Sequence, residues 1–361
     1  MRVLVLNPGS STLKASLLDP ARDDPPDIGV AEWPAGRDAD APQVVADALA
    51  QLPSTADAVG YRVVHGGLRY RSATPVDEEL LDAVEALDAL APLHNHRAAL
   101  VMRAARDALP GPPHVACFDT AFHATLPEEA WRYPLPGDWV DRWEIRRFGF
   151  HGLSVAWSTR RAAELLDRPG EALRTVVAHL GSGCSVTAVD GDRSVATSMG
   201  MTPYEGLMMG TRSGSVDPGI LLHLLRQGVA LDELDEGITR RSGLLGLAGR
   251  PGAREVEEMA RSGDAAAQLA LDAFARSAAA GIAAAATALP AIDALVFTGG
   301  IGEHSSSIRA GIVRRLATLG VPGELRVPDG DGVLADGPPA VLVVEAREDR
   351  VIAAEVAAVV G

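Results

Sequence analysis

The sequence contains a single lysine, Lys14, and it follows a turn that is rich in glycine and hydroxyl side chains. Within this turn, at residues 7–12, Ser10 and Thr12 supply hydroxyl groups. Hydroxyl and backbone N–H groups beside a cation are the groups that bind phosphate. Apolar residues on both sides of the turn predict strands at 3–6 and 14–18. The whole stretch therefore predicts a hairpin that binds phosphate.

Two arginines stand in segments that contain glycines. Arg62 precedes His65-Gly66-Gly67, and Arg212 lies in Gly210-Thr211-Arg212-Ser213-Gly214. A guanidinium group stays charged and makes paired hydrogen bonds to a carboxylate or a phosphoryl group. Glycines let a ligand approach the backbone closely. Arg62 and Arg212 are therefore candidates to bind a carboxylate or a phosphoryl group.

One acid and two histidines complete the candidate reactive side chains. Asp119 ends the strand predicted at 114–119, and the carboxyl ends of strands face the ligand in open α/β sheets. His151 lies in a glycine-bounded turn, and His94 precedes the helix predicted at 95–109. We therefore expect Asp119 to position another group or to act in the shell of a metal ion.

Two further glycine clusters lie in the second half of the chain. In residues 175–189, a strand, the turn Gly181-Ser182-Gly183 and a second strand repeat the layout of residues 3–18. The strand predicted at 294–298 runs into Gly299-Gly300-Ile301-Gly302-Glu303, and glycines before a helix suit the approach of an anion. Taken alone, this last cluster is a weak signal. The repeated layout predicts a duplicated α/β unit with paired phosphate hairpins.

The elements around these segments alternate between strands and helices. Further strands are predicted at 58–64 and 340–345, and helices at 43–52, 77–90, 95–109, 153–166, 219–227, 264–289, 306–319 and 349–360. Residues 19–42 are predicted to form a variable surface hairpin or loop, and residues 320–339 a loop, because both segments are rich in turn-forming residues. This order is typical of an α/β layer fold, and 361 residues are enough for two domains.

Composition argues against several classes of function. The formal net charge is −15, so a nucleic-acid or anionic-membrane partner is not expected. The apolar segment 278–289 is short and rich in alanine, which predicts a buried helix rather than a membrane span. Two cysteines do not indicate a disulfide framework. The start of the sequence does not follow the pattern of a signal peptide, and we expect a cytoplasmic protein.

The motifs resemble those of the acetate kinase family, within the actin, Hsp70 and sugar-kinase superfamily. Asn7-Pro8-Gly9-Ser10-Ser11-Thr12-Leu13-Lys14 resembles the first phosphate loop of that family, and the segments around Arg62, Asp119, His151 and Arg212 match its motifs in order. The resemblance implies an α/β, two-domain actin-like (ribonuclease H-like) fold with an active-site cleft between the domains. It implies an acceptor-side domain at 1–148 plus 349–361 and a nucleotide-side domain at 149–348.

The resemblance also implies roles for individual residues. The implied catalytic residues are Arg62, His94, Asp119, His151 and Arg212. A short acyl group would lie beside Arg62 against the apolar walls Val64, Leu93, Phe150 and Pro203. The donor nucleotide would contact Ser10, Thr12, Lys14, His179, Leu180, Gly181, Ser182, Gly183, Arg254, Gly299, Gly300, Gly302 and Glu303. Asn7 and Glu348 would hold Mg²⁺, with Mn²⁺ able to substitute, and the family implies a homodimer.

Most departures from the family pattern lie in the segments that are expected to bind the phosphoryl donor. The family's nucleoside-contacting Ser-Asp-x-Arg segment is Arg250-Pro251-Gly252-Ala253-Arg254 here, without the Asp, and Ser182 replaces an Asn of the second phosphate loop. Elsewhere, His96-Arg97-Ala98 stands where the family has Pro-Pro-Asn. The chain is also shorter than expected for the family, chiefly in residues 19–42 and after residue 320.

The sequence therefore predicts a kinase that reversibly transfers the γ-phosphoryl group of ATP to acetate or propionate, giving an acyl phosphate, with Mg²⁺. Because the donor side departs from the family, pyrophosphate or another inorganic phosphoryl donor is an alternative. Pro8 leaves a butyrate-kinase-like specificity open as well. A nucleotide-gated binding protein that has lost turnover is a third interpretation, and the presence of Arg62, Asp119, His151 and Arg212 argues against it.

Overall fold

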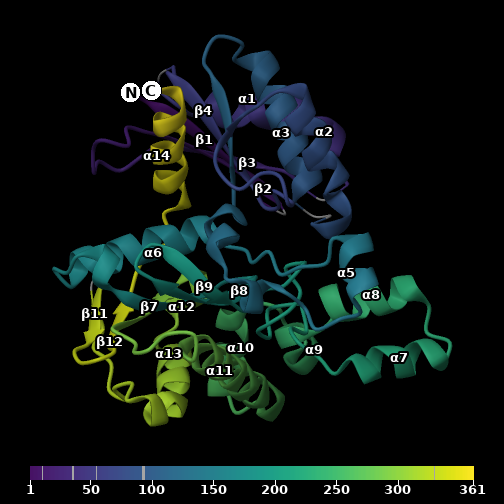
Figure 1. The fold of residues 1–361 in the computed structure, drawn as a ribbon, viewed down its shortest axis with the longest axis vertical. Coiled ribbons are helices and arrows are strands. Elements are labelled where there is room, and N and C mark those ends of the chain that lie inside the picture. Colours follow the sequence, from purple (N-terminus) through teal and green to yellow (C-terminus); the bar gives the residue numbers. More distant parts are fainter. Residues whose placement is uncertain (10, 35, 54, 92–93, 329) are drawn as a thin grey trace. The chain divides into compact units, whose positions relative to one another are not determined.

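The computed structural model describes residues 1–9, 11–34, 36–53, 55–91, 94–328 and 330–361. They divide into two compact units (Figure 1). The first unit comprises Met1–Ala124, Phe150–Trp157 and Arg347–Gly361, and the second comprises Thr125–Gly149 and Ser158–Ala346. Both units are α/β structures built around one six-stranded mixed sheet, as the sequence predicted.

The sheet of the first unit has the strand order β3-β2-β1-β4-β6-β5. Strand β1 is antiparallel to β2 and parallel to β4, which is in turn parallel to β6. The strands are β1 (Val3–Pro8), β2 (Thr12–Leu18), β3 (Asp27–Glu32), β4 (Ala58–Val63), β5 (Thr74–Pro75) and β6 (His114–Phe118). Because β1, β4 and β6 are parallel, their carboxyl ends lie along one edge of the sheet.

Helices cover both faces of this sheet, because alternate residues of β1 point to opposite sides. Leu4 and Leu6 join the core under α1 (Ala41–Leu49), α2 (Glu78–Ala86) and α3 (Asn95–Ala108). Val3 and Val5 join a second core with Ile352 and Val356 of α14 (Glu348–Val360). Figure 1 shows α14 on one side of the sheet and α1–α3 on the other. The first residues of α6 (Gly152–Leu165) pack into the second core.

The sheet of the second unit repeats this topology. Its strands are β7 (Arg174–Leu180), β8 (Cys184–Asp190), β9 (Arg193–Thr197), β10 (Ala294–Thr298), β11 (Gly332–Ala335) and β12 (Ala340–Val343). Read from β9, the order β9-β8-β7-β10-β12-β11 corresponds strand by strand to β3-β2-β1-β4-β6-β5, and each pair keeps its direction. The predicted duplication is therefore confirmed.

The second unit carries more helices than the first. They are α4 (Glu128–Trp131), α5 (Gly137–Trp143), most of α6, α7 (Pro218–Arg226), α8 (Leu231–Arg240), α9 (Gly243–Ala248), α10 (Ala253–Arg261), α11 (Ala265–Ala286), α12 (Gly299–His304) and α13 (Ser306–Val313). By length and hydropathy alone α11 could cross a membrane. It instead packs within this unit against β7, β8, α9, α10 and α13, as a core helix.

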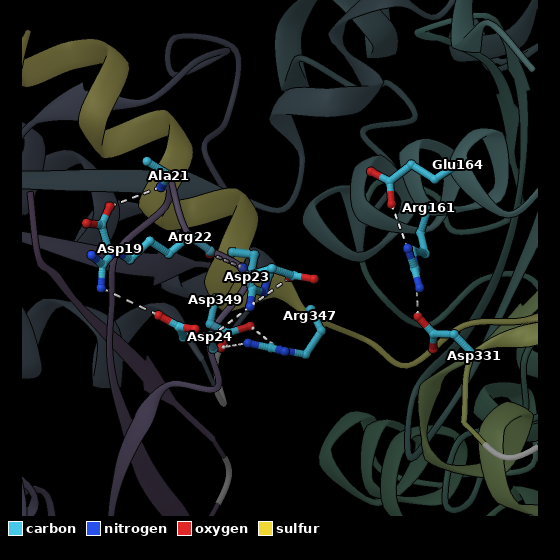
Figure 2. A network of polar contacts seen from close by, with 11 residues as sticks. Asp19, Ala21, Arg22, Asp23, Asp24, Arg161, Glu164, Asp331, Arg347 and Asp349 are labelled. Carbon is cyan, nitrogen blue, oxygen red and sulfur yellow. Dashed lines mark hydrogen bonds and ion pairs between the residues drawn. The ribbon is translucent and has the colours of Figure 1, made fainter. Parts of the chain in front are cut away.

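Of the surface hairpin or loop predicted at residues 19–42, the hairpin is confirmed, because β3 is antiparallel to β2, but the segment is not confined to the surface. Strand β3 forms the edge of the sheet beside β2, and Trp33 after it is completely buried. The turn before β3 is bound to the start of α14 (Figure 2): Arg350 donates to the carbonyl oxygens of Arg22 and Asp24 at 2.8 and 2.9 Å. The apolar residues of β3 are few, which is why the sequence pattern did not reveal this strand.

Other elements were also absent from the prediction. The loop predicted at 320–339 contains β11, and β5, β9, α4, α5, α8, α9 and α10 were not predicted. In the second unit, Arg161 of α6 joins Glu164 and Asp331, just before β11, at 2.8 and 3.0 Å (Figure 2). These elements are short, and several are held by polar contacts that leave no periodic apolar pattern.

The division into units differs from the predicted boundary at residues 148 and 149. Residues 125–149 belong to the second unit, where the N–H groups of Phe148 and Gly149 both donate to the carbonyl oxygen of Gly200, at 3.0 and 3.3 Å. Residues 150–157 belong to the first unit, where the Gly152 N–H donates to the carbonyl oxygen of Asp119 at 2.9 Å. Glu348 also lies in the first unit rather than the second.

Candidate active site

Four candidate residues meet at the carboxyl edge of the first sheet. Arg62 of β4 donates to both carboxylate oxygens of Asp119, with Nε at 3.1 and 3.2 Å and Nη2 at 2.7 Å. Its Nη1 lies 3.1 Å from Glu348 Oε2 and 3.4 Å from Asn7 Oδ1. Asn7 Nδ2 also donates to Glu348 at 3.4 Å. Residues predicted separately for catalysis and for metal binding thus form one cluster.

The fold explains this cluster. Asn7 lies near the end of β1, Arg62 near the end of β4, and Asp119 directly follows β6. Parallel neighbouring strands end at the same edge, so these side chains meet. Glu348 begins α14, where the partial positive charge of a helix N-terminus favours a carboxylate. Asp119 is fixed further by its own N–H, which donates to the carbonyl oxygen of Val63 at 2.9 Å.

The electrostatics of the cluster follow from this geometry. Burial alone would lower the pKa of Arg62, but the carboxylates of Asp119 and Glu348 outweigh burial and raise it. Asp119 is only 1% exposed, so its contacts with Arg62 replace its hydration. One cation between two carboxylates leaves an excess of negative charge at the edge of the sheet. That charge suits a divalent cation with oxygen ligands.

The turn that carries His151 is attached to Asp119. His151 has a left-handed backbone with φ of +58°, which is uncommon for a residue other than glycine and occurs at functional sites. The next residue must be glycine, because a Cβ at Gly152 would lie 2.2 Å from the carbonyl oxygen of Asp119. On the other side, His123 Nε2 lies 2.9 Å from the carbonyl oxygen of Phe150. His151 and Asp119 are therefore held by one local structure.

His94 stands directly before helix α3, and the first turn of this helix fixes the loop after β4. The side-chain amide of Asn95 accepts from the His65 N–H at 3.0 Å and donates to the His65 carbonyl oxygen at 2.9 Å. Asn95 is completely buried. The sequence analysis did not single out Asn95, although a polar residue in a buried first turn next to a candidate histidine was a usable signal.

The hairpin of β1 and β2 has the predicted form. Its turn closes with a hydrogen bond of 2.7 Å from the Gly9 N–H to the Thr12 carbonyl oxygen. Lys14 pairs with Asn7 across the two strands, so both side chains lie on one face, and Lys14 is exposed. The ammonium group of Lys14 therefore lies beside the Arg62 cluster and is open to solvent. Ser10 lies outside the described residues.

The corresponding hairpin of the second unit joins β7 and β8. Its turn, Gly181-Ser182-Gly183, closes with a hydrogen bond of 3.0 Å from the Gly181 N–H to the Gly183 carbonyl oxygen. Gly299, with φ of +76°, lies against this hairpin, because a Cβ there would be 2.8 Å from the Leu180 carbonyl oxygen and 3.1 Å from His179 Nε2. The two glycine clusters predicted for the nucleotide are thus neighbours in space.

A buried arginine supports the second glycine cluster. Arg309 of α13 donates to the carbonyl oxygens of Gly302 and Glu303 at 2.7 and 2.6 Å. The carboxylate of Glu303 accepts from the Ala346 N–H at 3.0 Å, and burial raises the pKa of Glu303. Sequence reasoning missed Arg309, although it stands on an otherwise apolar helix face between Ile308 and Ile312.

Arg212 belongs to the second unit and has different surroundings from Arg62. It donates to the carbonyl oxygen of Pro203 at 3.1 Å, and its guanidinium lies 5.8 Å from the centre of the Tyr204 ring. Among the described residues no carboxylate lies within ion-pair distance of it. Burial lowers the pKa of Arg212, but an arginine stays charged. A largely buried cation without a carboxylate partner is suited to bind an anion.

The segment around Arg212 also contacts the two donor-side segments of the second unit. A Cβ at Gly210 would lie 2.9 Å from the Pro251 carbonyl oxygen and 3.8 Å from that of Ser182. Arg254 begins the first turn of α10 and is 92% exposed, with Glu258 as its ion-pair partner at 3.4 Å. Gly300 and Gly302 lie in α12 beside the hairpin.

The predicted acyl walls are only partly brought together. Val64 and Phe150 are both buried in the first unit, and Phe150 contacts His65 edge to face. Pro203 lies in the second unit, and Leu93 lies outside the described residues. The two walls that share a unit therefore flank the loop after Arg62.

The comparisons with known proteins agree with this arrangement. An acetate kinase from Deinococcus radiodurans is 45% identical over all of this chain and 98% of its own length. An acetate kinase structure from Porphyromonas gingivalis superposes with a TM-score of 0.88 at 31% identity, covering all of both chains. A propionate kinase structure from Francisella tularensis gives 0.87 at 32% identity over 99% of both. The fold is thus the predicted actin-like one. The Acetokinase family model matches residues 39–354, and the chain belongs to the acetokinase family.

Proposed function

We propose that this protein transfers the γ-phosphoryl group of ATP to acetate or propionate, reversibly and with Mg²⁺, to give an acyl phosphate. Family membership makes the chain a phosphotransferase with a carboxyl acceptor. The observation that carries the proposal is the cluster of Arg62, Asp119, Glu348 and Asn7 at the edge of the first sheet. It combines a fixed cation for a carboxylate with oxygen ligands for a metal ion.

In this proposal Arg62 binds the acceptor carboxylate and Asp119 positions Arg62. Asp119 accepts three hydrogen bonds from Arg62 and is buried, so its oxygens are occupied in orienting the guanidinium. The acceptor is ionised and needs no proton acceptor. Asp119 therefore acts as the positioning group that the sequence predicted. The buried Val64 and Phe150 beside this loop favour a short acyl tail.

Arg212 would neutralise the phosphoryl group in transfer, and His151 would contact it. Arg212 is a partly buried cation that lacks a carboxylate among the described residues, so an arriving phosphoryl group would meet little competition for it. Charge neutralisation of this kind dominates phosphoryl transfer. The strained backbone at His151 supports a functional role for its side chain.

In the second unit, Gly181–Gly183 and Gly299–Gly302 would supply backbone N–H groups to the donor phosphates, and in the first unit Lys14 is the candidate phosphate-binding cation. The nucleoside would lie near Arg254. A cavity of about 240 Å³ lies between α10, α11 and α13 and is lined by Glu257, Ile308 and Arg314 among others.

The residues present fit Mg²⁺, with Mn²⁺ as a substitute. Among the described residues no group of three His, Cys, Asp or Glu forms a complete metal site. Magnesium commonly takes only one or two protein oxygens and completes its shell with water and phosphate oxygens. Glu348 and Asn7 offer such oxygens beside Lys14. When bound, the ion would neutralise charge on the donor phosphates.

We further propose that the protein is a cytoplasmic homodimer. Both cysteines are buried free thiols, as expected in a reducing compartment. In α7 and at the start of α8, Ile220, Leu222, Leu225 and Leu231 expose between 41% and 70% of their surface. Adjacent exposed apolar side chains of this size are typical of an interface, and a second copy is the partner that the family resemblance implies.

A hydroxamate-trapping assay tests the reaction directly. The protein would be incubated with hydroxylamine, Mg²⁺ and acetate, propionate or butyrate, with either ATP or pyrophosphate as donor. We expect acyl hydroxamate with ATP and the two shorter acids. Product with pyrophosphate alone would support the inorganic donor, which the comparisons do not favour. A correctly folded protein that forms no hydroxamate with any donor would contradict the proposal.

A further inference from the structure

Helix α3 carries an arginine that is buried next to the first phosphate hairpin. Arg97 lies in the first turn of this helix, in the His96-Arg97-Ala98 segment that replaces the family's Pro-Pro-Asn, and its side chain is 8% exposed. The site described above does not use it. A buried guanidinium must find several acceptors to offset its lost hydration.

The acceptors of Arg97 come from two segments of the first unit. Nη1 donates to the Trp33 carbonyl oxygen at 2.9 Å and to the Gly9 carbonyl oxygen at 3.3 Å, and Nη2 donates to the Pro34 carbonyl oxygen at 2.8 Å. The guanidinium also lies 4.3 Å from the centre of the Trp33 ring, and its Nε is 3.5 Å from Asp38. Arg97 therefore joins the hairpin turn to the residues that follow β3.

These contacts determine how the hairpin turn is held. The Trp33 N–H donates to the Ser11 carbonyl oxygen at 2.8 Å, while the Gly9 N–H donates to the Thr12 carbonyl oxygen. A carbonyl group and the N–H of the following residue share one rigid peptide plane. Fixing the Ser11 carbonyl through Trp33 thus fixes the peptide plane that joins Ser11 to Thr12, and with it the place of the Thr12 hydroxyl group, which is a candidate phosphate contact. Arg97 contacts Trp33 in two ways, because its guanidinium group lies over the Trp33 ring and also donates to the Trp33 carbonyl oxygen.

The same helical turn also contacts the loop after Arg62, which is proposed to bind the acceptor. Asn95, two residues earlier, clamps the backbone of His65 in the loop after Arg62. One turn of α3 thus contacts the phosphate hairpin through Arg97 and the acceptor loop through Asn95.

We propose that Arg97 is a positioning residue that holds the Gly9–Thr12 turn in the conformation that binds the donor phosphates. This inference rests on the proposed function, because it assigns the turn to the donor. Without the guanidinium, the turn loses a hydrogen bond at Gly9, and the Trp33 and Pro34 carbonyl oxygens lose their donor. The Thr12 hydroxyl group then samples other positions, which weakens binding of the donor more than binding of the acceptor.

The experiment compares Arg97→Met with Arg350→Met. Arg350 is a matched control, because it is also buried and donates to two carbonyl oxygens at the other end of the same 19–34 segment, at Arg22 and Asp24. We expect both variants to lower Tm. We expect Arg97→Met alone to raise KM for ATP at least tenfold, with KM for acetate within twofold of the parent. Arg97→Lys, which keeps the charge but not the forked geometry, should lie between the two.

Binding of MgADP, measured by calorimetry, separates this inference from the reaction. We expect Arg97→Met to weaken MgADP binding about tenfold and Arg350→Met to leave it within twofold. If the parent binds MgADP but forms no acyl phosphate, the proposed reaction fails while this test still stands. Equal KM and Kd values for the parent and both arginine variants, with only Tm lowered, would show that Arg97 merely stabilises the fold. Should Arg97→Met not fold, unchanged KM and Kd values in Arg97→Lys would equally overturn the proposal.

Discussion

The two units share one strand order but present different chemistry at the corresponding edges of their sheets. In the first unit, the edge carries Asn7, Arg62 and Asp119, which interact through their side chains. In the second, the corresponding β7 and β10 lead into the turn 181–183, where Ser182 is exposed, and into the buried Gly299, which is followed by the exposed Gly300. Under the proposed function, the same topology would support recognition by fixed side-chain charges in one unit and by backbone N–H groups in the other. The apolar core specifies the fold, and a few residues at the strand ends specify the chemistry.

The two arginines make this difference concrete. Arg62 is held by two carboxylates, so its charge is balanced and its geometry fixed before a substrate arrives. Arg212 is largely buried and lacks a carboxylate partner among the described residues, so its charge is available to an anion. Removing the two side chains should therefore have different consequences for activity and for stability.

Replacement of Arg212 should have the largest effect on catalysis. We expect Arg212→Ala to lower kcat by 10³-fold or more, by analogy with arginines that neutralise a phosphoryl group in transfer. Its stability should stay close to that of the parent, because no buried carboxylate loses its partner. Steady-state kinetics and urea unfolding would measure the two quantities. Arg193→Ala, at an exposed position of the same unit, is the control and should change neither; kcat within threefold of the parent in Arg212→Ala would refute the assigned role.

Replacement of Arg62 should damage both activity and stability. Arg62→Ala leaves the 1% exposed carboxylate of Asp119 without its cation, and breaking a buried ion pair in this way costs about 3–5 kcal/mol. The double variant Arg62→Ala with Asp119→Ala should recover part of that loss but no activity, because the unpaired charge is gone while the carboxylate clamp is still missing. Equal stability of Arg62→Ala and Arg212→Ala would remove the distinction between the two arginines.

The buried histidine behind the His151 turn should make stability depend on pH. Burial lowers the pKa of His123 from 6.5 to about 4, against the opposing contribution of the Phe150 carbonyl oxygen. Because the pKa in the folded state is the lower one, the unfolded chain takes up the proton first. This contribution to stability is complete above pH 6.5 and is lost as the pH falls towards 4, by up to about 3 kcal/mol.

Urea unfolding between pH 7 and 4 measures that dependence. His123→Gln should lose less stability over this range than the parent, whereas the control His223→Gln, at an exposed position of α7, should follow the parent. If the free energy of unfolding depends on pH identically in the parent and in His123→Gln, the expected burial of a neutral His123 is contradicted.

Much of the fold was predictable because apolar runs and glycine turns record it directly. The hairpins of residues 3–18 and 175–189 and the helix near 265–286 were all found from such patterns. Strand β3 was not, because only one of its faces is buried and it therefore lacks the continuous apolar run of the interior strands. The boundary between the units was also displaced, because hydrogen bonds of Phe148 and Gly149 to Gly200 leave no periodic signal.

For the candidate site, residue types and turn context in the sequence indicated which residues take part. The sequence did not indicate which of these residues contact one another. The sequence indicated Arg62, Asp119, Asn7 and Glu348, yet only the strand register places all four in one cluster. It did not give the partners of Asn95, Arg97 or Arg309, because their hydrogen bonds go to backbone carbonyl groups that lie 30, 64 and 7 residues away in the chain. A carbonyl acceptor carries no residue identity, so no sequence motif reports it.

The smallest expected effect concerns the choice of nucleotide. The family's nucleoside segment contains an Asp that can accept hydrogen bonds, whereas Gly252 and Ala253 stand there in this chain, and Arg254 is 92% exposed. Phosphate contacts through Lys14 and the two hairpins are common to all nucleoside triphosphates. We therefore expect kcat/KM values for ATP and GTP within about tenfold, which corresponds to about 1.4 kcal/mol. A preference for ATP above a hundredfold would mean that other groups read the base.

Gly252→Asp tests the reason for this weak discrimination as well as its size. Gly252 is the N-cap of α10, has ordinary extended backbone angles and makes no side-chain capping bond, and the nearest atom to a built Cβ is Glu255 Cδ at 3.7 Å. An aspartate fits there and should also stabilise the helix by about 1 kcal/mol as a cap. If the missing acceptor causes the weak discrimination, the ratio of kcat/KM for ATP over GTP should rise several-fold in this variant. A higher Tm with an unchanged ratio would show that position 252 caps the helix without reading the base.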